Sequence, residues 1–256
     1  MGEAEMNFDA LVVAGGKNDG ALRKISDKKY ESLIEIAGKP MVQHVIDAVK
    51  KVEEINDIVI VGPEELNDFT NNDYNIIIPK GRMINNIKRG IEALNNQNHI
   101  LIITSDIPLV TPEIIQEFIH RCKKEKKYDL FYPIISKEIN LEKYPEVERT
   151  YVHLDEGVFT GGNLVLVSPT IIQGPLDWYN RILSLRKKPL KMSKMLGFKF
   201  IIKFIFRRLS ITEVETRISE IIGHDCKALI LEYPEIGFDV DKPSDLKMMR
   251  EKYLKT

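Results

Sequence analysis

The first forty residues carry side chains suited to chemistry on a polyphosphate. The apolar run Leu11–Val13 leads into Ala14, Gly15 and Gly16, and a loop rich in lysine and arginine follows. Glycines let the backbone approach a ligand closely, and backbone N–H groups with basic side chains suit phosphate oxygens. The pattern predicts a phosphate-binding loop. The alternative is an ordinary glycine turn at the end of a strand.

A second candidate group surrounds Asp106. This aspartate follows the apolar segment Ile100–Ile103, and Pro108 then stops an extended segment. Ligands of open α/β sheets bind beyond the carboxyl ends of the strands. Asp106 is therefore placed where a hard cation such as Mg²⁺ could bridge it to phosphate oxygens. A turn or helix-capping role is the alternative.

Together these segments resemble the nucleotidyltransferases with a molybdenum-cofactor guanylyltransferase-like domain, within the nucleotide-diphospho-sugar transferase superfamily. The resemblance rests on Ala14–Gly16, on Gly38–Pro40 and on Asp106 followed by Ile107–Leu109. The stretch Ala37–Asp47 is also similar to bacterial UDP-N-acetylglucosamine pyrophosphorylases. These enzymes transfer a nucleoside monophosphate from an NTP to a phosphorylated acceptor and release pyrophosphate. The resemblance implies an NTP, a phosphorylated small molecule and Mg²⁺ as partners.

The resemblance also assigns roles to individual residues. The nucleotide-binding set is Ala14, Gly15, Gly16, Gly81, Arg82, Asn86 and Ser105. The acceptor-binding set is Arg149, Gly161, Gly162 and Asn163. A plain helix N-cap at Asn86 and a Gly-Gly-Asn turn at 161–163 are the alternatives.

The metal site implied by the resemblance combines Asp106 with a C-terminal pair. Asp241 matches the second metal ligand of the family. Asp239 lies two residues earlier on an extended segment and points the same way, so it either supports Asp241 or substitutes for it. Asp245 fits better as an acid at a helix N-terminus.

The chain departs from the family at a basic residue. The family has a lysine shortly before Gly-Lys-Pro, and Glu31 occupies that position here. We expect Lys17, Arg23, Lys28 or Lys29, from a longer loop, to supply the missing charge. The catalytic set is therefore Lys17, Arg23 and Lys29 together with Asp106. A glutamate could meet a triphosphate only through a metal, so a nucleotide-binding protein without catalysis is an alternative.

The elements that must position these residues alternate along the chain. Apolar strands are expected at 9–13, 58–61, 76–78 and 100–104, and helical periodicity at 40–51, at 83–94 and after Thr111. This alternation predicts a three-layer α/β/α, Rossmann-like, mostly parallel sheet. We expect one nucleotidyltransferase domain over residues 1–256.

A basic helical insertion is expected at residues 174–224. Between 178 and 212 the chain has no acidic residue, and bases interleave with large apolar side chains. Such a segment suits an anionic membrane surface or an acidic partner. The interpretation we favour is an amphipathic helix that packs on the domain or on a second subunit.

Composition narrows the remaining classes. The 256 residues include 37 lysines and arginines, 38 acids and two cysteines, which argues against nucleic-acid binding and against a disulfide framework. We expect a cytoplasmic enzyme. A nucleotide-sugar-dependent glycosyltransferase is disfavoured because Thr104-Ser105-Asp106 lacks the Asp-x-Asp pattern. A non-catalytic nucleotide-binding protein at an anionic membrane surface would account for both Glu31 and the basic segment.

Overall fold

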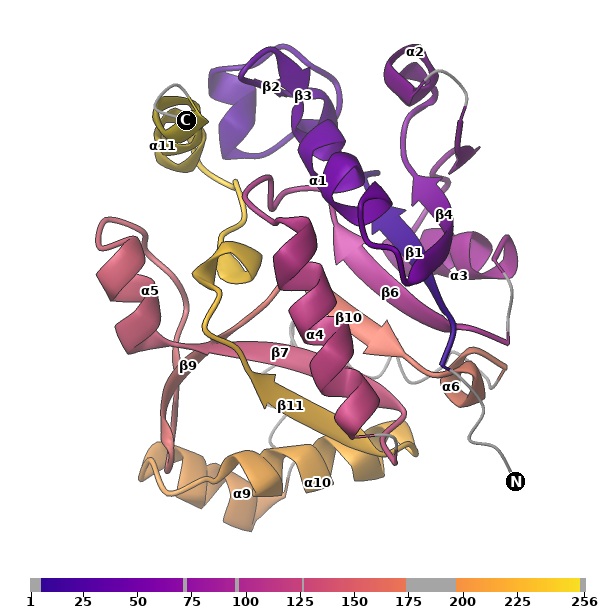
Figure 1. The fold of residues 1–256 in the computed structure, drawn as a ribbon. Coiled ribbons are helices and arrows are strands. Elements are labelled where there is room, and N and C mark those ends of the chain that lie inside the picture. Colours follow the sequence, from indigo (N-terminus) through magenta and orange to yellow (C-terminus); the bar gives the residue numbers. More distant parts are fainter. Residues whose placement is uncertain (1–5, 71–72, 95–96, 126, 174–196, 254–256) are drawn as a thin grey trace.

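The computed structural model describes residues 6–70, 73–94, 97–125, 127–173 and 197–253. Within these residues, four parallel strands form one half of a nine-stranded sheet (Figure 1). In spatial order they are β5 (Asn75–Ile77), β4 (Ile55–Val61), β1 (Phe8–Val13) and β6 (His99–Thr104). The strands expected from the sequence are confirmed.

The order of these strands creates a binding position. From β1 the chain proceeds to β4 and β5 at one edge, and it returns on the other side of β1 as β6. The strand order therefore reverses between β1 and β6, and ligands of open α/β sheets bind at such a switch point. Ala14 and Ser105 each directly follow one of these two strands, so the two candidate groups meet there.

Helices cover both faces of the sheet. Ala10 and Val12 of β1 pack on the side of α1 (Met41–Lys50) and α4 (Pro112–Lys124). Leu11 packs on the opposite side, against α3 (Met83–Glu92). A Cβ at Gly90 of α3 would overlap the Leu11 side chain, so the close approach of helix and strand requires glycine. Burial on both faces explains the uninterrupted apolar strands, and the expected three-layer architecture is confirmed.

The second half of the sheet is largely antiparallel and was not predicted in detail. Strand β10 (Leu164–Val167) runs antiparallel between β6 and β7 (Leu130–Ser136). Strand β7 also pairs antiparallel with β9 (Gly157–Gly161) and parallel with β11 (Cys226–Ile230). Strand β8 (Val152–Leu154) pairs with β9 at the edge.

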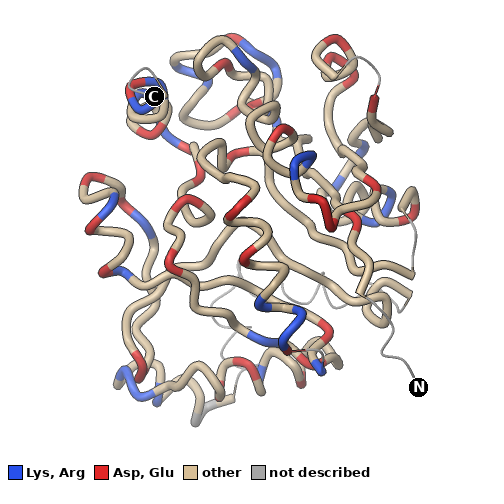
Figure 2. Tube along the Cα trace, viewed as in Figure 1, with Lys and Arg blue, Asp and Glu red and all other residues tan. Residues whose placement is uncertain are grey.

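Further elements connect and flank these strands and helices. They are η1 (Ala21–Lys24), η2 (Glu31–Leu33), β2 (Glu35–Ile36), β3 (Lys39–Pro40), η3 (Glu64–Leu66), α2 (Asn67–Thr70), α5 (Lys137–Lys143), α6 (Pro169–Gln173), η4 (Pro234–Gly237) and α11 (Pro243–Tyr253). Acidic and basic residues are interspersed along the chain (Figure 2), in line with the nearly balanced composition.

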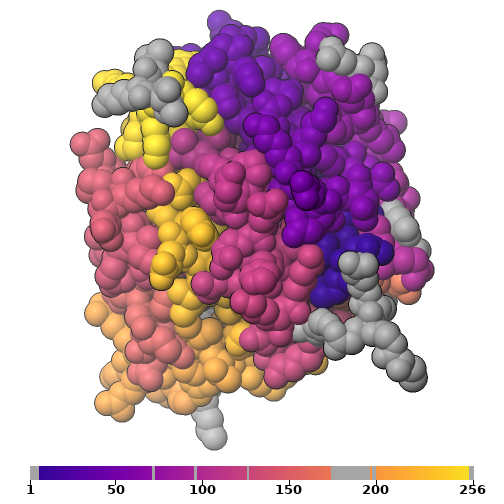
Figure 3. Space-filling model, viewed as in Figure 1, coloured from indigo at the N-terminus to yellow at the C-terminus, as the bar shows by residue number. Residues whose placement is uncertain are grey.

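The expected insertion falls partly within the described residues. Residues 174–196 lie outside them, whereas α9 (Phe198–Ile205) and α10 (Ile211–Ile222) lie below β11 (Figures 1 and 3). Helix α10 packs Ile222 into the core. Beside it, Ile205 and Phe206 are 67% and 69% exposed. Among the described residues, no helix has the length and hydrophobicity needed to cross a membrane. The single domain and the bounds 174–224 stay predictions.

Candidate active site

The predicted nucleotide loop leaves β1 at the switch point. The Ala14 N–H donates to the Val61 carbonyl at 2.6 Å, and the Ser32 hydroxyl donates to the Ala14 carbonyl at 2.8 Å. A Cβ on Gly15 would lie 3.0 Å from the Pro79 Cβ. The loop at 14–16 therefore packs against the turn that contains Gly81, and the tertiary structure brings two predicted nucleotide segments together.

The turn before α3 is fastened by Asn86. This side chain is buried, and its Oδ1 accepts from the Lys80 N–H at 2.7 Å. Gly81 has a φ of 71°, a backbone conformation that glycine adopts without strain. The N-cap of α3 is Arg82, so Asn86 is not the N-cap residue. Asn86 holds the turn in shape, and exposed Arg82 lies at the helix start.

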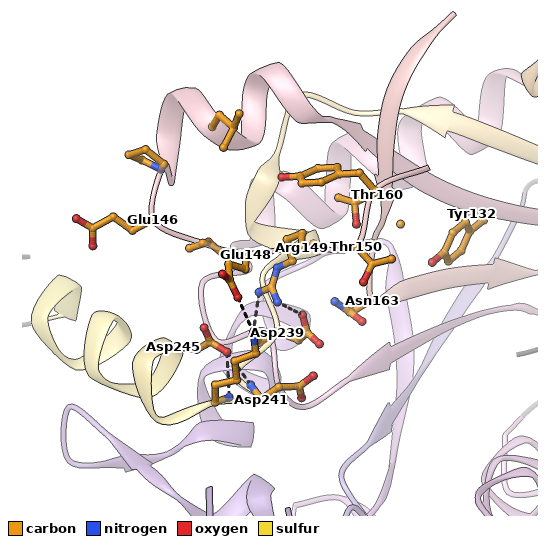
Figure 4. Close-up of a pocket in the computed structure, with 18 residues that line it drawn as sticks. Tyr132, Glu146, Glu148, Arg149, Thr150, Thr160, Asn163, Asp239, Asp241 and Asp245 are labelled. Carbon is orange, nitrogen blue, oxygen red and sulfur yellow. Dashed lines mark hydrogen bonds and ion pairs between the residues drawn. The ribbon is translucent and has the colours of Figure 1, made fainter. Parts of the chain in front are cut away.

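Three aspartates, from two segments that are distant in sequence, lie close together. Asp106, Asp239 and Asp241 each offer a carboxylate oxygen, and these oxygens all lie within 4.8 Å of one another. The Val240 N–H donates to the Asp106 carbonyl at 2.9 Å and ties the segments together. Asp245 accepts from the Asp241 and Lys242 N–H groups at 3.2 and 3.0 Å, as expected for an acid at the start of a helix. Figure 4 shows Asp239, Asp241 and Asp245 side by side.

The electrostatics of this cluster favour a bound cation. Loss of hydration, followed by the charge of Asp239, raises the pKa of Asp106 to about 6. The same two causes, in the same order, raise the pKa of Asp241 to about 7. The Thr104 hydroxyl donates to Asp106 and partly opposes the shift. Converging carboxylate oxygens are the donors that Mg²⁺ prefers, so the residues fit the metal that the fold family implies.

Arg149 neutralises part of this cluster. Its Nη1 lies 2.8 Å from Asp239 Oδ1, and its Nη2 donates to the Asp239 carbonyl at 2.8 Å. The guanidinium stacks over Phe238, 4.9 Å from the ring centroid. The buried Nε–H has no hydrogen-bond partner. Arg149 therefore orients Asp239, and its unpaired Nε–H is enclosed by protein atoms.

A cavity of about 870 Å³ adjoins the acidic cluster. All four predicted acceptor residues line it, namely Arg149, Gly161, Gly162 and Asn163. The space beside the two glycines is filled by the protein itself. A Cβ on Gly161 would overlap the Tyr132 hydroxyl, and one on Gly162 would lie 2.9 Å from the Pro133 Cγ. Asn163 Nδ2 donates to the Ile236 carbonyl at 3.3 Å. These residues shape the wall of the cavity.

The predicted loop bases are dispersed. Arg23 donates to the Asp27 carbonyl at 2.8 Å, and Lys29 stacks on Tyr30 with its Nζ 5.3 Å from the ring centroid. Lys17, next to Gly16, is exposed. Arg23 and Lys29 thus have partners within the loop, whereas Lys17 is the predicted base adjacent to the glycines in sequence.

Glu31 lies against the predicted nucleotide-binding loop. Its N–H donates to the Gly16 carbonyl at 3.1 Å. Its two carboxylate oxygens lie 3.6 and 3.7 Å from where a Cβ would stand on Gly16 and Gly20. Burial, then the charges of Asp106 and Asp19, raise the pKa of Glu31. The position that the family gives to a lysine therefore holds a carboxylate near the aspartate cluster.

Comparison with known proteins identifies the family. The sequence profile described as "MobA-like NTP transferase domain" matches residues 10–190. The chain belongs to this family. A solved structure described as a hypothetical transferase from Thermus thermophilus superposes with a TM-score of 0.83 at 33% identity, covering 94% of this chain and 100% of the other.

The named relatives of this chain are nucleotidyltransferases. A probable molybdenum cofactor guanylyltransferase of Natranaerobius thermophilus is 29% identical over 135 residues, which are 51% of this chain and 62% of that protein. The bifunctional protein GlmU of Staphylococcus epidermidis is 32% identical over 119 residues, 44% of this chain and 26% of GlmU. The alignments thus span less than two thirds of these relatives. The family and superfamily expected from Ala14–Gly16 and Asp106 are confirmed, and the chain falls among NTP-dependent transferases.

Several residues of the cavity wall carried little sequence signal. Tyr132, on β7, and Thr160, on β9, line the cavity beside the predicted acceptor residues. Tyr132 follows Leu130 and Phe131 within a mostly apolar strand, and the structure leaves it 39% exposed. Thr160 became identifiable only once β9 was paired with β7.

Proposed function

We propose that this family member transfers a nucleoside monophosphate from an NTP to a phosphorylated small molecule and releases pyrophosphate. The observation that supports this most strongly is the position of the aspartate cluster. Asp106, two residues beyond β6, brings the cluster to the switch point, and Asp239 and Asp241 line the 870 Å³ cavity. A metal held there would neutralise the phosphate groups of two substrates that meet at the cluster.

The nucleotide occupies the side of Ala14–Gly16 and the turn at Gly81, where backbone groups face its phosphates and base. Ser105 completes this side because its N–H donates to the Val13 carbonyl and holds it beside the loop. Asp106 and Asp241, with Asp239, would hold Mg²⁺, which would supply charge neutralisation to the phosphates. Lys17, with Arg23 and Lys29, provides the positive charge of the loop. The protein's contribution is positioning and electrostatics.

The acceptor phosphate occupies the cavity near Arg149. One of its oxygens attacks the α-phosphorus and forms a new P–O–P bridge. The bond from the α-phosphorus to the β-bridging oxygen breaks, and pyrophosphate leaves with the electron pair. The positive charge of Arg149, in the wall of the cavity, attracts the acceptor phosphate, while its terminal nitrogens keep Asp239 in place.

The test has two stages. A thermal-shift screen of the four NTPs, with and without Mg²⁺, identifies the nucleotide, because a ligand of the folded state alone raises the melting temperature. The reverse reaction is then assayed by adding pyrophosphate to a panel of nucleoside diphosphate derivatives and measuring NTP formation. If none of the four NTPs raises the melting temperature in the presence of Mg²⁺, the proposal is contradicted.

We also propose that the protein acts in the cytoplasm. Cys122 and Cys226 are free and buried, in keeping with a reducing cytoplasm. Contact of the 178–212 segment with an anionic membrane or with a second subunit stays a prediction, and the described part of this segment exposes Ile205 and Phe206.

A further inference from the structure

The charges that line the acceptor cavity restrict the acceptor class, an inference that rests on the proposed function. Among the described lining residues, the cations are Arg149 and Lys242, and the acids are Glu146, Glu148, Asp239, Asp241 and Asp245. Both cations are engaged by acids of the same cavity. Arg149 binds Asp239, and Lys242 Nζ lies 3.1 Å from Glu148 Oε2.

The two ends of the cavity differ in chemistry. At one end Arg149 meets the aspartate cluster, where its guanidinium charge and a metal held by the aspartates would suit one phosphate group. Away from the cluster, Tyr132, Thr150 and Thr160 present hydroxyl groups, and Asn163 presents its amide nearer the cluster (Figure 4). These neutral groups hydrogen-bond hydroxyls well and offer no positive charge to a second anion.

The rim of the cavity adds negative charge. Glu146 and Glu148 lie on the segment that leads into Arg149, and both are exposed. A second anionic group on the acceptor would face these carboxylates, and both cations among the described lining residues are already paired with acids. Repulsion between like charges at this rim would weaken the binding of such an acceptor.

We infer that the acceptor is a phosphomonoester of a neutral, hydroxyl-bearing compound with no second negative charge. Its phosphate lies at the Arg149 end, and its hydroxyl-bearing body lies against Tyr132, Thr150, Thr160 and Asn163. The cavity volume of about 870 Å³ accommodates a body of sugar size. The inference concerns discrimination by charge, which neither the family nor its named relatives specify.

Matched pairs of probes test this inference. Glucose 1-phosphate and glucuronic acid 1-phosphate share one scaffold and differ by a hydroxymethyl group against a carboxylate. Glycerol 3-phosphate and 3-phosphoglycerate form a smaller pair with the same difference. Each probe is titrated calorimetrically into the full chain saturated with Mg²⁺ and a non-reactive analogue of the NTP that stabilises the protein. We expect the neutral member of at least one pair to bind about tenfold or more tightly than its carboxylate counterpart.

A variant separates charge from shape. Glu148→Gln removes the partner of Lys242 and should narrow the discrimination to about threefold or less, because the freed ammonium can meet the second anion. Glu142→Gln is the control, since Glu142 is an exposed residue of α5 that does not line the cavity. This control should keep the full discrimination.

The outcomes distinguish this inference from the proposed function. Equal or tighter binding of a carboxylate probe, or no binding of either neutral probe, would overturn the inference while NTP binding stayed intact. Unchanged discrimination in Glu148→Gln would also overturn the charge argument. Loss of NTP binding itself would instead count against the nucleotidyltransferase proposal.

Discussion

Asp241→Asn should stabilise the metal-free protein and at the same time impair its function. In the folded chain the Asp241 carboxylate lies within 4.8 Å of oxygens from Asp106 and Asp239. Its pKa is raised from 3.8 to about 7 by loss of hydration and by Asp239. The ionised form is therefore disfavoured in the folded state relative to the unfolded chain, and an amide at this position removes that repulsion.

The magnitude follows from linkage between protonation and folding. Each pKa unit corresponds to roughly 1.4 kcal/mol, so the full shift sets an upper bound near 4 kcal/mol. Asp241 reaches solvent and shares its repulsion with Asp239, and screening reduces the expected gain to about 1 kcal/mol. For a protein of this size that gain raises the melting temperature by about 2–4 °C.

The pH dependence has a definite sign. Because the folded pKa is raised, the destabilisation is absent below the unfolded value of 3.8 and grows as the pH rises to about 7. We expect Asp241→Asn to be more stable than the wild type at pH 8 in EDTA, with the difference shrinking towards pH 4. Adding Mg²⁺ and the NTP should stabilise the wild type and leave the variant nearly unchanged.

The assay is thermal unfolding of both proteins at several pH values, with EDTA or with Mg²⁺ and NTP. Asp57→Asn serves as a matched control, because Asp57 is an exposed residue near the start of β4, away from the cluster. A variant that is less stable than the wild type at pH 8 in EDTA would refute the argument. A gain that persists undiminished at pH 4 would refute it as well.

Other substitutions test the remaining assignments. Asp106→Ala and Asp241→Ala should each lower the rate of nucleotidyl transfer by about 10²-fold or more, and near-normal turnover in both would remove the metal assignment. Arg149→Met should raise KM for the acceptor about tenfold or more while KM for the NTP changes little, as steady-state kinetics would show. Lys17→Met should weaken NTP binding about tenfold in calorimetry, whereas Lys24→Met, an exposed base of η1, should not. Gly90→Ala should lower the free energy of unfolding by about 1–3 kcal/mol in denaturant titrations, because the added Cβ would overlap Leu11.

The parallel half of the fold was predictable because its signals are local. Strand β1 is buried on both faces, so Leu11–Val13 is a continuous apolar run that ends at glycines. Helices α1 and α3 show apolar periodicity on one face. The antiparallel half was harder to predict, because β7 exposes Tyr132 within an apolar run and takes β11 as a partner from far along the chain.

The sequence by itself determined the chemical types of the site and their order. It identified the glycine loop at 14–16, the aspartates 106, 239 and 241, and the glutamate where the family has a lysine. These features can be identified from the sequence because residue identity and spacing depend on the covalent chain alone. They were enough to predict an NTP transferase, and its dependence on a metal stays a prediction.

Only the tertiary structure decided how these groups are partnered. It joined Asp106 to the C-terminal segment through the Val240 N–H, gave Asp239 to Arg149, and placed Glu31 against Gly16 and Gly20. It also formed the cavity whose lining cations are both engaged by acids. Such contacts join segments that are distant in sequence, and they depend on strand order and loop path. Local sequence patterns do not encode these distances, so the partnerships emerge only when the sheet has assembled.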